Sequence, residues 1–331
     1  MITNLTVFYP GEPGTYSIRR VSEALLHRLP SNIHIQEYVL PGKDASIRSI
    51  IKNILFVWKH RNVKGYNYLT IQSYNILGLL GCKTIITVHD LNPVYGILGR
   101  KDNYFKKKIV YFFWIYLPIM LACKINCVSN YTKKQCHDYV CHKDMKVVYN
   151  MLHSSFENIP RNKKYNSLCK KKNILIVGTS KQKNIETLFH AIRGINIHLH
   201  IIGHLSDQQV RLLNDIEYTN YVNLDDESVC RVYKESDIVV FISISEGFGM
   251  PILEAQSTGC VLLCSNVEPM NEIAGEGALY VDPFSVDSVK KGLMTLLEEE
   301  NLCNDLIKKG YENLSRFNPS KIVSDFLLLF Q

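Results

Sequence analysis

The sequence predicts an α/β protein built from two doubly wound domains, each with a parallel sheet. Short apolar runs alternate with stretches whose apolar residues recur at helical spacing, such as residues 17–29. Runs that are apolar throughout are typical of strands that are covered on both faces of a parallel sheet. The chain has 331 residues, which is long for one domain, and a polar, basic segment at 157–173 separates two sets of six runs.

Each set of runs supplies one expected sheet. The strands expected before the polar segment are 4–10, 33–39, 68–73, 83–90, 125–129 and 146–150. Those expected after it are 173–178, 197–203, 221–224, 238–243, 261–265 and 278–281. We therefore expect an N-terminal domain at 1–160, a second domain at 161–315, and a C-terminal helix at 316–331 that packs back on the first domain. Ligands should lie at the carboxyl ends of the strands, in a cleft between the domains.

Charge is distributed unevenly along the chain. Residues 1–165 hold 23 Lys and Arg against 9 Asp and Glu, whereas residues 166–331 hold 15 against 22. The excess of +14 in the first half indicates an anionic partner, such as nucleic acid, a membrane surface or an acidic substrate. A solvated basic face is the alternative.

Two stretches in the basic half mix aromatic and basic residues. Residues 46–61 read "SIRSIIKNILFVWKHR", and residues 104–124 read "YFKKKIVYFFWIYLPIMLACK". The apolar run from Ile109 to Cys123 has 15 residues and contains Pro118, so it is short for a membrane span. Either it forms a buried helix, or it lies as a basic, aromatic-edged helix on an anionic membrane surface.

The ten cysteines and the first residues indicate a cytoplasmic protein. "MITNLTVFYP" has neither a basic start nor a long apolar stretch, so no secretory signal is expected. The cysteines are then expected to be reduced thiols, mostly in the core. Cysteine and histidine gather between Cys123 and His142, but no CxxC pair occurs there and the spacing does not fit a common zinc site.

A pair of glutamates brackets a predicted strand–loop–helix junction at "SEGFGMPILEAQSTG", residues 245–259. Gly247 and Gly249 allow a sharp turn, and Pro251 suits the first turn of a helix. The start of that helix offers an anion site. Glu246 and Glu254 would then accept hydrogen bonds from hydroxyl groups at the two ends of a ligand whose middle carries phosphate. The alternative is that the two glutamates only cap the helix.

"EGFGMPILE" at 246–254 resembles the Glu-x7-Glu motif of the family 4 retaining nucleotide-sugar glycosyltransferases, which have the GT-B fold. Further resemblances follow the family's order along nearly the whole chain. They are "TVHDL", "CVSNYTKKQ", "VVYNM", "VGTSKQKNIETLFHAI" and "EPMNEIAGEGALYVDP". The resemblance implies two Rossmann-like domains that face a central cleft, with the acceptor on the first domain and the nucleotide-sugar donor on the second.

The resemblance also implies roles for individual residues. Glu246 would contact the hydroxyls of the donor sugar, Glu254 would bind ribose, and Lys183 would neutralise the departing diphosphate. His89 would lie beside the transferred sugar. The remaining donor-binding residues would be Gly14 in the first loop, Thr179 after the phosphate-loop glycine, and the backbone of Gly247, Phe248, Gly249 and Met250.

Several of these residues have plain structural alternatives. His89 could be a core or helix-capping histidine, Lys183 a solvated side chain and Gly14 an ordinary turn. Asn150 could end a strand, and Glu272 could cap a helix.

The chain departs from the family pattern at two places. Thr179 follows Gly178 where an arginine is common, although Lys181 could replace it. Gly11 and Gly14 are split by Glu12 and Pro13, where the family often has adjacent glycines. Both departures bear on the geometry of donor binding more than on the class of reaction.

The reaction is expected to need neither metal nor cofactor. Breaking the bond between sugar and phosphate leaves negative charge on the diphosphate, which a metal ion or fixed donors must stabilise. No Asp-x-Asp pair occurs in the sequence, whereas Lys183 and the start of a helix could do this work. The resemblance implies retention of configuration, with the leaving phosphate taking the proton of the acceptor.

The expected function is transfer of a hexosyl unit from a UDP- or GDP-sugar to a lipid-linked or membrane-held glycan, as in assembly of a bacterial surface polysaccharide. The protein would then sit peripherally on the inner face of the cell membrane. A non-catalytic GT-B partner subunit that binds donor or another transferase is the alternative.

Other classes have less support. No helix-turn-helix, zinc-finger or RNP pattern favours nucleic acid. A dinucleotide-dependent oxidoreductase is not favoured, because no G-x-G-x-x-G follows the first strand. A nucleotide triphosphatase is not favoured either, because no G-x-x-x-x-G-K-[ST] loop occurs. The sugar, the base, the acceptor, the linkage and the oligomeric state are not readable from the sequence.

Overall fold

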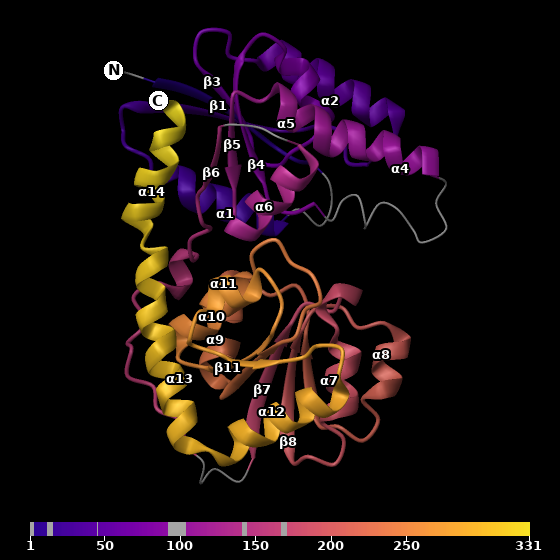
Figure 1. Cartoon of the computed structure of the whole chain (residues 1–331), viewed down its shortest axis with the longest axis vertical. Coiled ribbons are helices and arrows are strands. Elements are labelled where there is room, and N and C mark those ends of the chain that lie inside the picture. Colours follow the sequence, from indigo (N-terminus) through magenta and orange to yellow (C-terminus); the bar gives the residue numbers. More distant parts are fainter. Residues whose placement is uncertain (1–2, 12–15, 45, 92–103, 141–143, 167–170) are drawn as a thin grey trace. The chain divides into compact units, whose positions relative to one another are not determined.

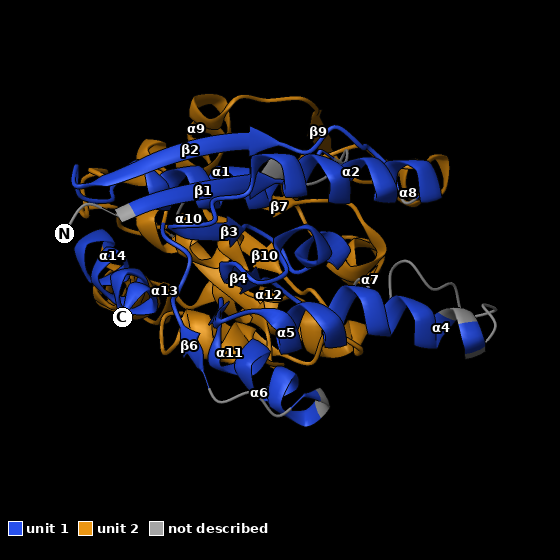
Figure 2. Ribbon diagram, turned by 90° about the horizontal axis from the view of Figure 1, so that it is seen from above, with its two compact units in different colours: residues 1–151, 319–331 blue, residues 152–318 orange. Residues whose placement is uncertain are grey.

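The computed structural model describes residues 3–11, 16–44, 46–91, 104–140, 144–166 and 171–331. The chain forms two compact units, which Figure 2 draws in different colours. Unit 1 comprises residues 1–151 and 319–331, and unit 2 comprises residues 152–318. The sequence placed the two boundaries after residues 160 and 315, so the first one lies earlier in the structure and the second one slightly later.

Unit 1 contains a six-stranded parallel sheet with the strand order β2-β1-β3-β4-β5-β6 (Figures 1 and 2). Its strands are β1 (Thr3–Tyr9), β2 (Ile33–Val39), β3 (Tyr66–Leu69), β4 (Lys83–Val88), β5 (Lys124–Cys127) and β6 (Met145–Val147). Its helices include α1 (Tyr16–Leu26), α2 (Ile47–His60), the 3₁₀ helix η1 (Tyr74–Leu79), α4 (Tyr104–Tyr111), the π-helical turn η2 (Phe112–Tyr116), α5 (Leu117–Leu121) and α6 (Asn130–Tyr139).

The end of the chain returns to unit 1. Helix α14 (Pro319–Leu327) and the turn η6 (Leu328–Phe330) pack on its sheet, where the ring of Phe326 meets Tyr68 edge-on with 5.4 Å between centroids. The Tyr66 hydroxyl donates to the carbonyl oxygen of Phe330 over 2.9 Å. These contacts join segments about 260 residues apart along the chain.

Unit 2 contains a second six-stranded parallel sheet with the order β12-β11-β10-β7-β8-β9. Its strands are β7 (Lys172–Val177), β8 (Ile197–Ile202), β9 (Tyr218–Tyr221), β10 (Ile238–Phe241), β11 (Val261–Ser265) and β12 (Leu279–Val281). Its helices include η3 (Ser154–Phe156), η4 (Lys181–Lys183), α7 (Ile185–Ala191), α8 (Asp207–Leu212), α9 (Asp226–Glu235), α10 (Met250–Thr258), α11 (Met270–Ala274), α12 (Val286–Glu298), α13 (Glu300–Asn313) and η5 (Leu314–Phe317).

Burial explains why the central strands could be recognised from sequence. Every residue of β10 and β11 is buried, because helices cover both faces of the sheet. The expected strand at 221–224 is wrong, since β9 spans Tyr218–Tyr221 and Asn223 has a left-handed backbone with φ of 55°. Strand β9 is an edge strand that is exposed in part, so it carries no continuous apolar run.

Both sheets contain a topological switch point, where successive connections leave in opposite directions. In unit 2 the switch lies between β7 and β10, and in unit 1 it lies between β1 and β3. In open α/β sheets, ligands bind outside the carboxyl ends of the strands that flank such a point. The loops that follow β7 and β10 are therefore the place to look for a site in unit 2.

Eight cysteines lie in the described part of the chain as free thiols, and all of them except Cys123 are buried. Within the same residues, no helix is both long and apolar enough to cross a membrane.

Candidate functional site

The loops that follow β7 and β10 bring two of the predicted catalytic residues together. Lys183 Nζ lies 2.7 Å from Glu246 Oε1, and the two side chains are only 19% and 15% exposed. Lys183 ends the turn η4, while Glu246 lies in the loop between β10 and α10. The sequence predicted both residues but not their contact, because they are 63 positions apart.

Lys183 is further fixed by an aromatic neighbour and by the backbone. Its ammonium lies 4.8 Å from the centroid of the Phe241 ring, which adds a cation–π attraction. Gly178 has φ of 85°, and a Cβ atom there would approach Lys183 Cε to 2.9 Å. The positive φ therefore favours glycine in the turn after β7, and the Lys183 side chain packs against this glycine. Lys183 is thus held at the site and is not a freely solvated side chain.

Helix α10 begins at the site without a side-chain cap. Its N-cap is Gly249, which has φ of 99°, and Pro251 stands in the first turn. The N-cap residue has no side chain that could cap the helix, and the Glu246 carboxylate bonds to Lys183. The start of α10 instead presents the positive end of the helix dipole beside Lys183 and Glu246.

The loop before α10 is held by burial of its aromatic residue. Phe248 is buried and packs edge-on against Phe317, with 5.9 Å between ring centroids. Gly247 and Gly249 are also buried, while Met250 is partly exposed. The predicted diphosphate-binding backbone, Gly247 to Met250, therefore lies on an anchored loop.

Glu254 points into the interior of unit 2. It is 4% exposed, and its Oε2 accepts a 2.7 Å hydrogen bond from the Tyr233 hydroxyl. Tyr233 comes from α9, is fully buried, and packs edge-on against Phe156 with 5.3 Å between centroids. Tyr233 could not be identified from the sequence, because nothing in the pattern of α9 distinguishes a tyrosine whose hydroxyl is bonded from one that only fills the core.

Thr179 is engaged with the neighbouring loop. Its hydroxyl donates to the carbonyl oxygen of His204, and its own carbonyl accepts a 3.0 Å bond from Gln209 Nε2. These bonds tie the loop after β7 to the loop after β8 and to α8. Lys181, the expected replacement for the family's arginine, is exposed.

A second residue missed by sequence analysis is Asn184, between η4 and α7. Its backbone is left-handed with φ of 56°, and its Nδ2 lies 2.6 Å from the carbonyl oxygen of Pro283 and 3.4 Å from that of Ile242. Asparagine tolerates this conformation better than most residues, which is the signal that could have identified it. Asn184 thereby links the loop of Lys183 to the ends of β10 and β12.

His89 lies in unit 1, just beyond the carboxyl end of β4. Its Nε2 donates to the carbonyl oxygen of Thr70 over 2.9 Å, so the neutral ring carries its lone pair on Nδ1. Burial lowers the pKa of His89 to about 4. The imidazole is therefore neutral at physiological pH, as an uncharged acceptor or donor beside a ligand would be.

The pocket around His89 is small, about 10 Å³, and its lining combines hydroxyl and amide groups with apolar side chains such as Leu25 and Val148. Thr87 Oγ1 lies 2.6 Å from the Tyr68 hydroxyl and accepts a 3.1 Å bond from Asn126 Nδ2. Burial raises the pKa of Tyr68 to about 12, so its hydroxyl keeps its proton. Asn150, for which a strand-ending role was the alternative, also lines this pocket.

Gly14 lies outside the described residues. Within the described part of the chain, no group of three His, Cys, Asp or Glu side chains is arranged to hold a metal ion.

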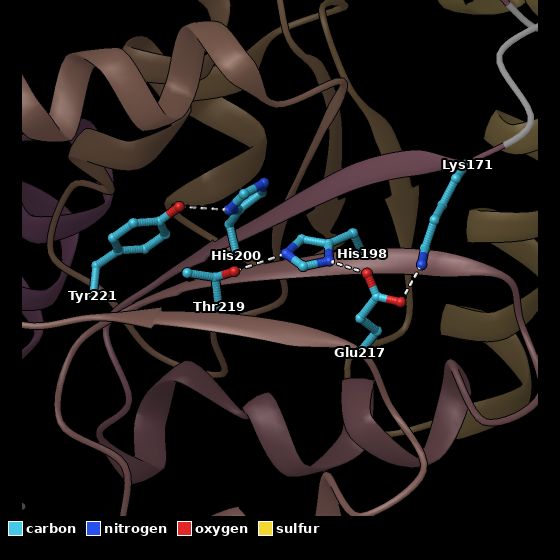
Figure 3. Close-up of polar contacts among 6 residues, drawn as sticks. All are labelled: Lys171, His198, His200, Glu217, Thr219 and Tyr221. Carbon is cyan, nitrogen blue, oxygen red and sulfur yellow. Dashed lines mark hydrogen bonds and ion pairs between the residues drawn. The ribbon is translucent and has the colours of Figure 1, made fainter.

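A separate polar cluster runs along β8 and β9 of the unit 2 sheet (Figure 3). Glu217 accepts hydrogen bonds from Lys171 and from His198 Nδ1, the latter over 2.9 Å, and these bonds hold the pKa of Glu217 below its usual value. His198 Nε2 lies 2.8 Å from Thr219 Oγ1, and His200 Nδ1 lies 3.1 Å from the Tyr221 hydroxyl. The cluster begins near the amino ends of β7, β8 and β9, away from Lys183 and Glu246.

A known protein family matches the part of the chain that forms unit 2. Residues 158–313, just under half of the chain, match the model of the family "Glycosyl transferases group 1". This range covers nearly all of unit 2, including Lys183, Glu246 and Glu254.

Several curated proteins are related in sequence. The O-antigen chain mannosyltransferase B of Escherichia coli is 33% identical over 103 residues, which are 31% of this chain and 26% of that protein. The O-antigen chain mannosyltransferase RfbU of Salmonella typhimurium is 26% identical over 260 residues, 73% of this chain and 69% of the relative. An N-acetylgalactosaminyltransferase of Campylobacter jejuni, whose name gives a diphospho-undecaprenol-linked acceptor, is 26% identical over 56% of this chain and 53% of its own. The chain thus spans about a quarter to two thirds of these relatives.

Solved structures share the fold over the full length. Sucrose-phosphate synthase from Thermosynechococcus elongatus has a TM-score of 0.74 at 15% identity and covers 99% of this chain and 98% of its own. Anabaena HepE in complex with UDP and glucose has a TM-score of 0.71 at 14% identity over 99% of both chains. The chain therefore has the two-unit GT-B fold of glycosyltransferases, and its residues 158–313 match the glycosyl transferases group 1 family.

Proposed function

We propose that the protein is a retaining, metal-independent glycosyltransferase that moves a hexosyl unit from a nucleotide diphosphate sugar to a lipid-linked or membrane-held glycan. The observation that carries the proposal is the Lys183–Glu246 pair at the switch point of the unit 2 sheet, beside the start of α10. The sequence match of this unit to glycosyl transferases group 1 supports the class of reaction.

The site suits a ligand with a charged middle and polar ends. The start of α10 and the Lys183 ammonium supply positive charge for a diphosphate. An ammonium has three N–H donors, so Lys183 can keep its bond to Glu246 and still donate to phosphate oxygens. Glu246 has further lone pairs that can accept hydrogen bonds from sugar hydroxyls.

In the proposed mechanism, Lys183 and α10 stabilise the negative charge that develops on the leaving diphosphate. Such fixed charges and dipoles need no reorganisation during the reaction, which makes them effective catalysts. The leaving phosphate oxygen takes the proton of the acceptor hydroxyl, so the mechanism needs no nucleophile from the protein. Glu254 would hold the ribose, and Tyr233 would keep the Glu254 carboxylate in place.

Unit 1 would supply the acceptor side. Its small pocket at His89 has no Asp, Glu, Lys or Arg in its lining and includes hydroxyl and amide groups, which favour contact with a hydroxyl group of the ligand over contact with a phosphate. His89 would contact the transferred sugar as a neutral imidazole. Gly14 is proposed to lie in the loop that approaches the donor phosphate or the acceptor.

The names of the relatives support the biological setting. Two of them act on O-antigen chains, and the name of the third gives an acceptor on a diphospho-undecaprenol carrier. We therefore propose a role in bacterial surface polysaccharide synthesis, at the inner face of the cell membrane. A UDP- or GDP-sugar is the proposed donor.

The first experiment is a thermal-shift comparison of UDP, GDP, ADP and dTDP. A ligand that binds only the folded state raises the melting temperature, so the preferred nucleotide should stand out. If none of the four nucleotides raised the melting temperature, the proposed donor class would be contradicted.

The second experiment measures donor hydrolysis or transfer with the preferred donor, in buffer with and without EDTA. We expect activity in both buffers for the wild type and its loss in Glu246→Ala. Nucleotide binding without turnover in the wild type would favour the non-catalytic partner subunit instead. Loss of activity in EDTA would contradict metal independence.

A further inference from the structure

Helix α2 in unit 1 exposes a row of apolar side chains. Ile47, Ile51, Leu55 and Trp58 follow one another at spacings of four, four and three residues, so they share one face of the helix. Ile47 is 76% exposed and Trp58 is 57% exposed. The opposite face packs into the unit through Asn53 and Val57.

A second exposed row lies on the continuous helix formed by α4, η2 and α5. It consists of Phe105, Ile109, Phe112, Tyr116 and Met120, again at spacings of three or four residues. The rings of Phe112 and Tyr116 stack with 5.8 Å between centroids. The other face of this helix is buried through Val110, Ile115 and Ile119. The segment is therefore buried on one side and exposed on the other, so it is not a fully buried helix.

The two helices pack on the same support. Both α2 and α5 contact η1, and the Tyr74 ring of η1 meets Trp114 edge-on with 4.9 Å between centroids. In Figures 1 and 2, α2 and α4 extend in the same direction from the sheet of unit 1. We call the two exposed rows together the apolar docking surface.

Basic residues accompany the apolar docking surface. Arg48, Lys52 and Lys59 on α2 and Lys108 on α4 are exposed. The Arg61 guanidinium lies 4.6 Å from the centroid of the Trp58 ring. Neither residues 47–60 nor residues 104–121 contain an aspartate or a glutamate. The formal charges on these two helical segments are thus all positive.

This combination fits one kind of partner best. A second copy of this chain would bring lysines against lysines if the same faces met, which is unfavourable. An anionic bilayer offers phosphates for the basic residues and an apolar boundary for Trp, Phe and Ile. No described helix could span a bilayer, so these helices would lie along its surface.

We propose that the apolar docking surface binds an anionic membrane, with the Trp58 and Ile109 side chains inserted below the headgroups and the lysines paired with lipid phosphate. The inference deepens the proposed function, because a lipid-linked acceptor would be reached from this surface. Binding to vesicles itself needs neither donor nor acceptor, so the two proposals can fail separately.

The first test uses tryptophan fluorescence, since Trp58 and Trp114 are the two tryptophans of the sequence. In Trp114→Phe the emission reports Trp58 alone. We expect a blue shift, and quenching by brominated lipid, on adding phosphatidylglycerol–phosphatidylcholine vesicles. Phosphatidylcholine vesicles alone should have little effect. An unchanged Trp58 spectrum on the anionic vesicles would overturn the proposal.

The second test measures vesicle co-sedimentation of matched variants. Trp58→Ser with Ile109→Ser should weaken binding at least about tenfold, because each change removes a large apolar side chain from the inserted face. The control is Phe284→Ser in unit 2, whose side chain is 72% exposed, more than Trp58 or Ile109. An equal loss in the control, or no loss in the double variant, would contradict insertion at this surface.

The electrostatic part has its own pair of variants. Lys52→Glu with Lys59→Glu should weaken binding about thirtyfold or more, since each basic residue near an anionic surface contributes roughly a fivefold gain in affinity. Lys290→Glu with Lys291→Glu on α12 changes the net charge equally and should leave binding nearly unchanged. High salt should weaken wild-type binding. Equal effects of both pairs would mean that net charge alone drives binding. The surface would instead bind a second copy of the chain if the wild type formed a dimer in light scattering but did not bind vesicles, and if these variants lost the dimer.

Discussion

The carboxyl edges of the two sheets differ in the chemistry they present. In unit 2 the loops after β7 and β10 hold an ion pair, Lys183 with Glu246, at the start of a helix. In unit 1 the small pocket at the end of β4 has a neutral histidine, with hydroxyl, amide and apolar groups around it and no Asp, Glu, Lys or Arg. Both edges have the same origin in a doubly wound parallel sheet, so the fold alone does not set this difference.

The difference shows how one architecture can be adapted to two kinds of ligand. A charged edge with a helix dipole favours a phosphate, while an uncharged edge with many donors and acceptors favours hydroxyl groups. Four measurements test this contrast between the two edges.

The largest effect should come from separating the charged pair. Lys183→Met should lower the turnover of transfer or donor hydrolysis by about 10²–10³-fold, because it removes a fixed donor to the leaving group. Glu246→Gln keeps the shape of the side chain and should also lower turnover strongly. Lys181→Met, which changes an exposed lysine of the same turn, is the control in the steady-state assay. Comparable losses in Lys181→Met and Lys183→Met would remove the special role of the pair.

The second prediction concerns the neutral histidine of unit 1. The pKa of His89 is lowered to about 4 in the folded state, whereas an unfolded histidine titrates near 6.5. The unfolded chain therefore binds more protons below pH ~6.5, and the folded state loses stability as the pH falls from there towards 4. The contribution is at most about 3 kcal/mol. It is measured by urea unfolding at several pH values.

His89→Gln keeps a hydrogen-bonding side chain but does not titrate in this range. Its stability should therefore depend less on pH between 6.5 and 4 than that of the wild type. If both proteins lose stability in parallel, the histidine is not buried as a neutral group and the contrast between the two edges weakens.

The third prediction tests the support of Glu254. Tyr233→Phe leaves a buried carboxylate oxygen without its hydroxyl donor, which typically costs about 1–3 kcal/mol. We expect weaker binding of the preferred nucleotide, measured by calorimetry, and a smaller preference for it over its 2′-deoxy form. Tyr280→Phe, which removes a hydroxyl bonded to the carbonyl of Gly275, is the control in the same unit. If Tyr233→Phe kept the full preference for ribose over 2′-deoxyribose, Glu254 would not be the residue that binds the ribose.

The smallest effect is expected at the start of α10. Gly249 has φ of 99°, and an added Cβ would lie 3.0 Å from Ile252 Cδ1 and 3.2 Å from Phe241 Cε1. Gly249→Ala should lower the free energy of unfolding by about 1–2 kcal/mol. Gly81→Ala has a similar backbone problem with φ of 77° but open space around it, so it should cost less in the same urea titration. A cost at Gly249 no larger than at Gly81 would show that the helix start tolerates rearrangement.

Much of this protein was determined by local patterns in its sequence. Strand β10 is apolar throughout and β11 is apolar up to its final serine, so both could be placed from their continuous apolar runs. Glycines around Phe248 and a proline at 251 marked the start of α10, because these residues suit that backbone and few others do. The charged residues of the site in unit 2, Lys183 and Glu246, were also predicted from the sequence.

Contacts between distant segments were decided only by the tertiary structure. Lys183 meets Glu246, and Tyr233 meets Glu254, because the order of the strands places β7 beside β10 and α9 beside α10. Strand β9 was misplaced since an edge strand needs no apolar run, and the helix at 104–121 could not be assigned to core or surface because it belongs to both. The type of each side chain follows directly from the sequence. Its partners, its burial and its pKa depend on which elements the folded sheet brings together.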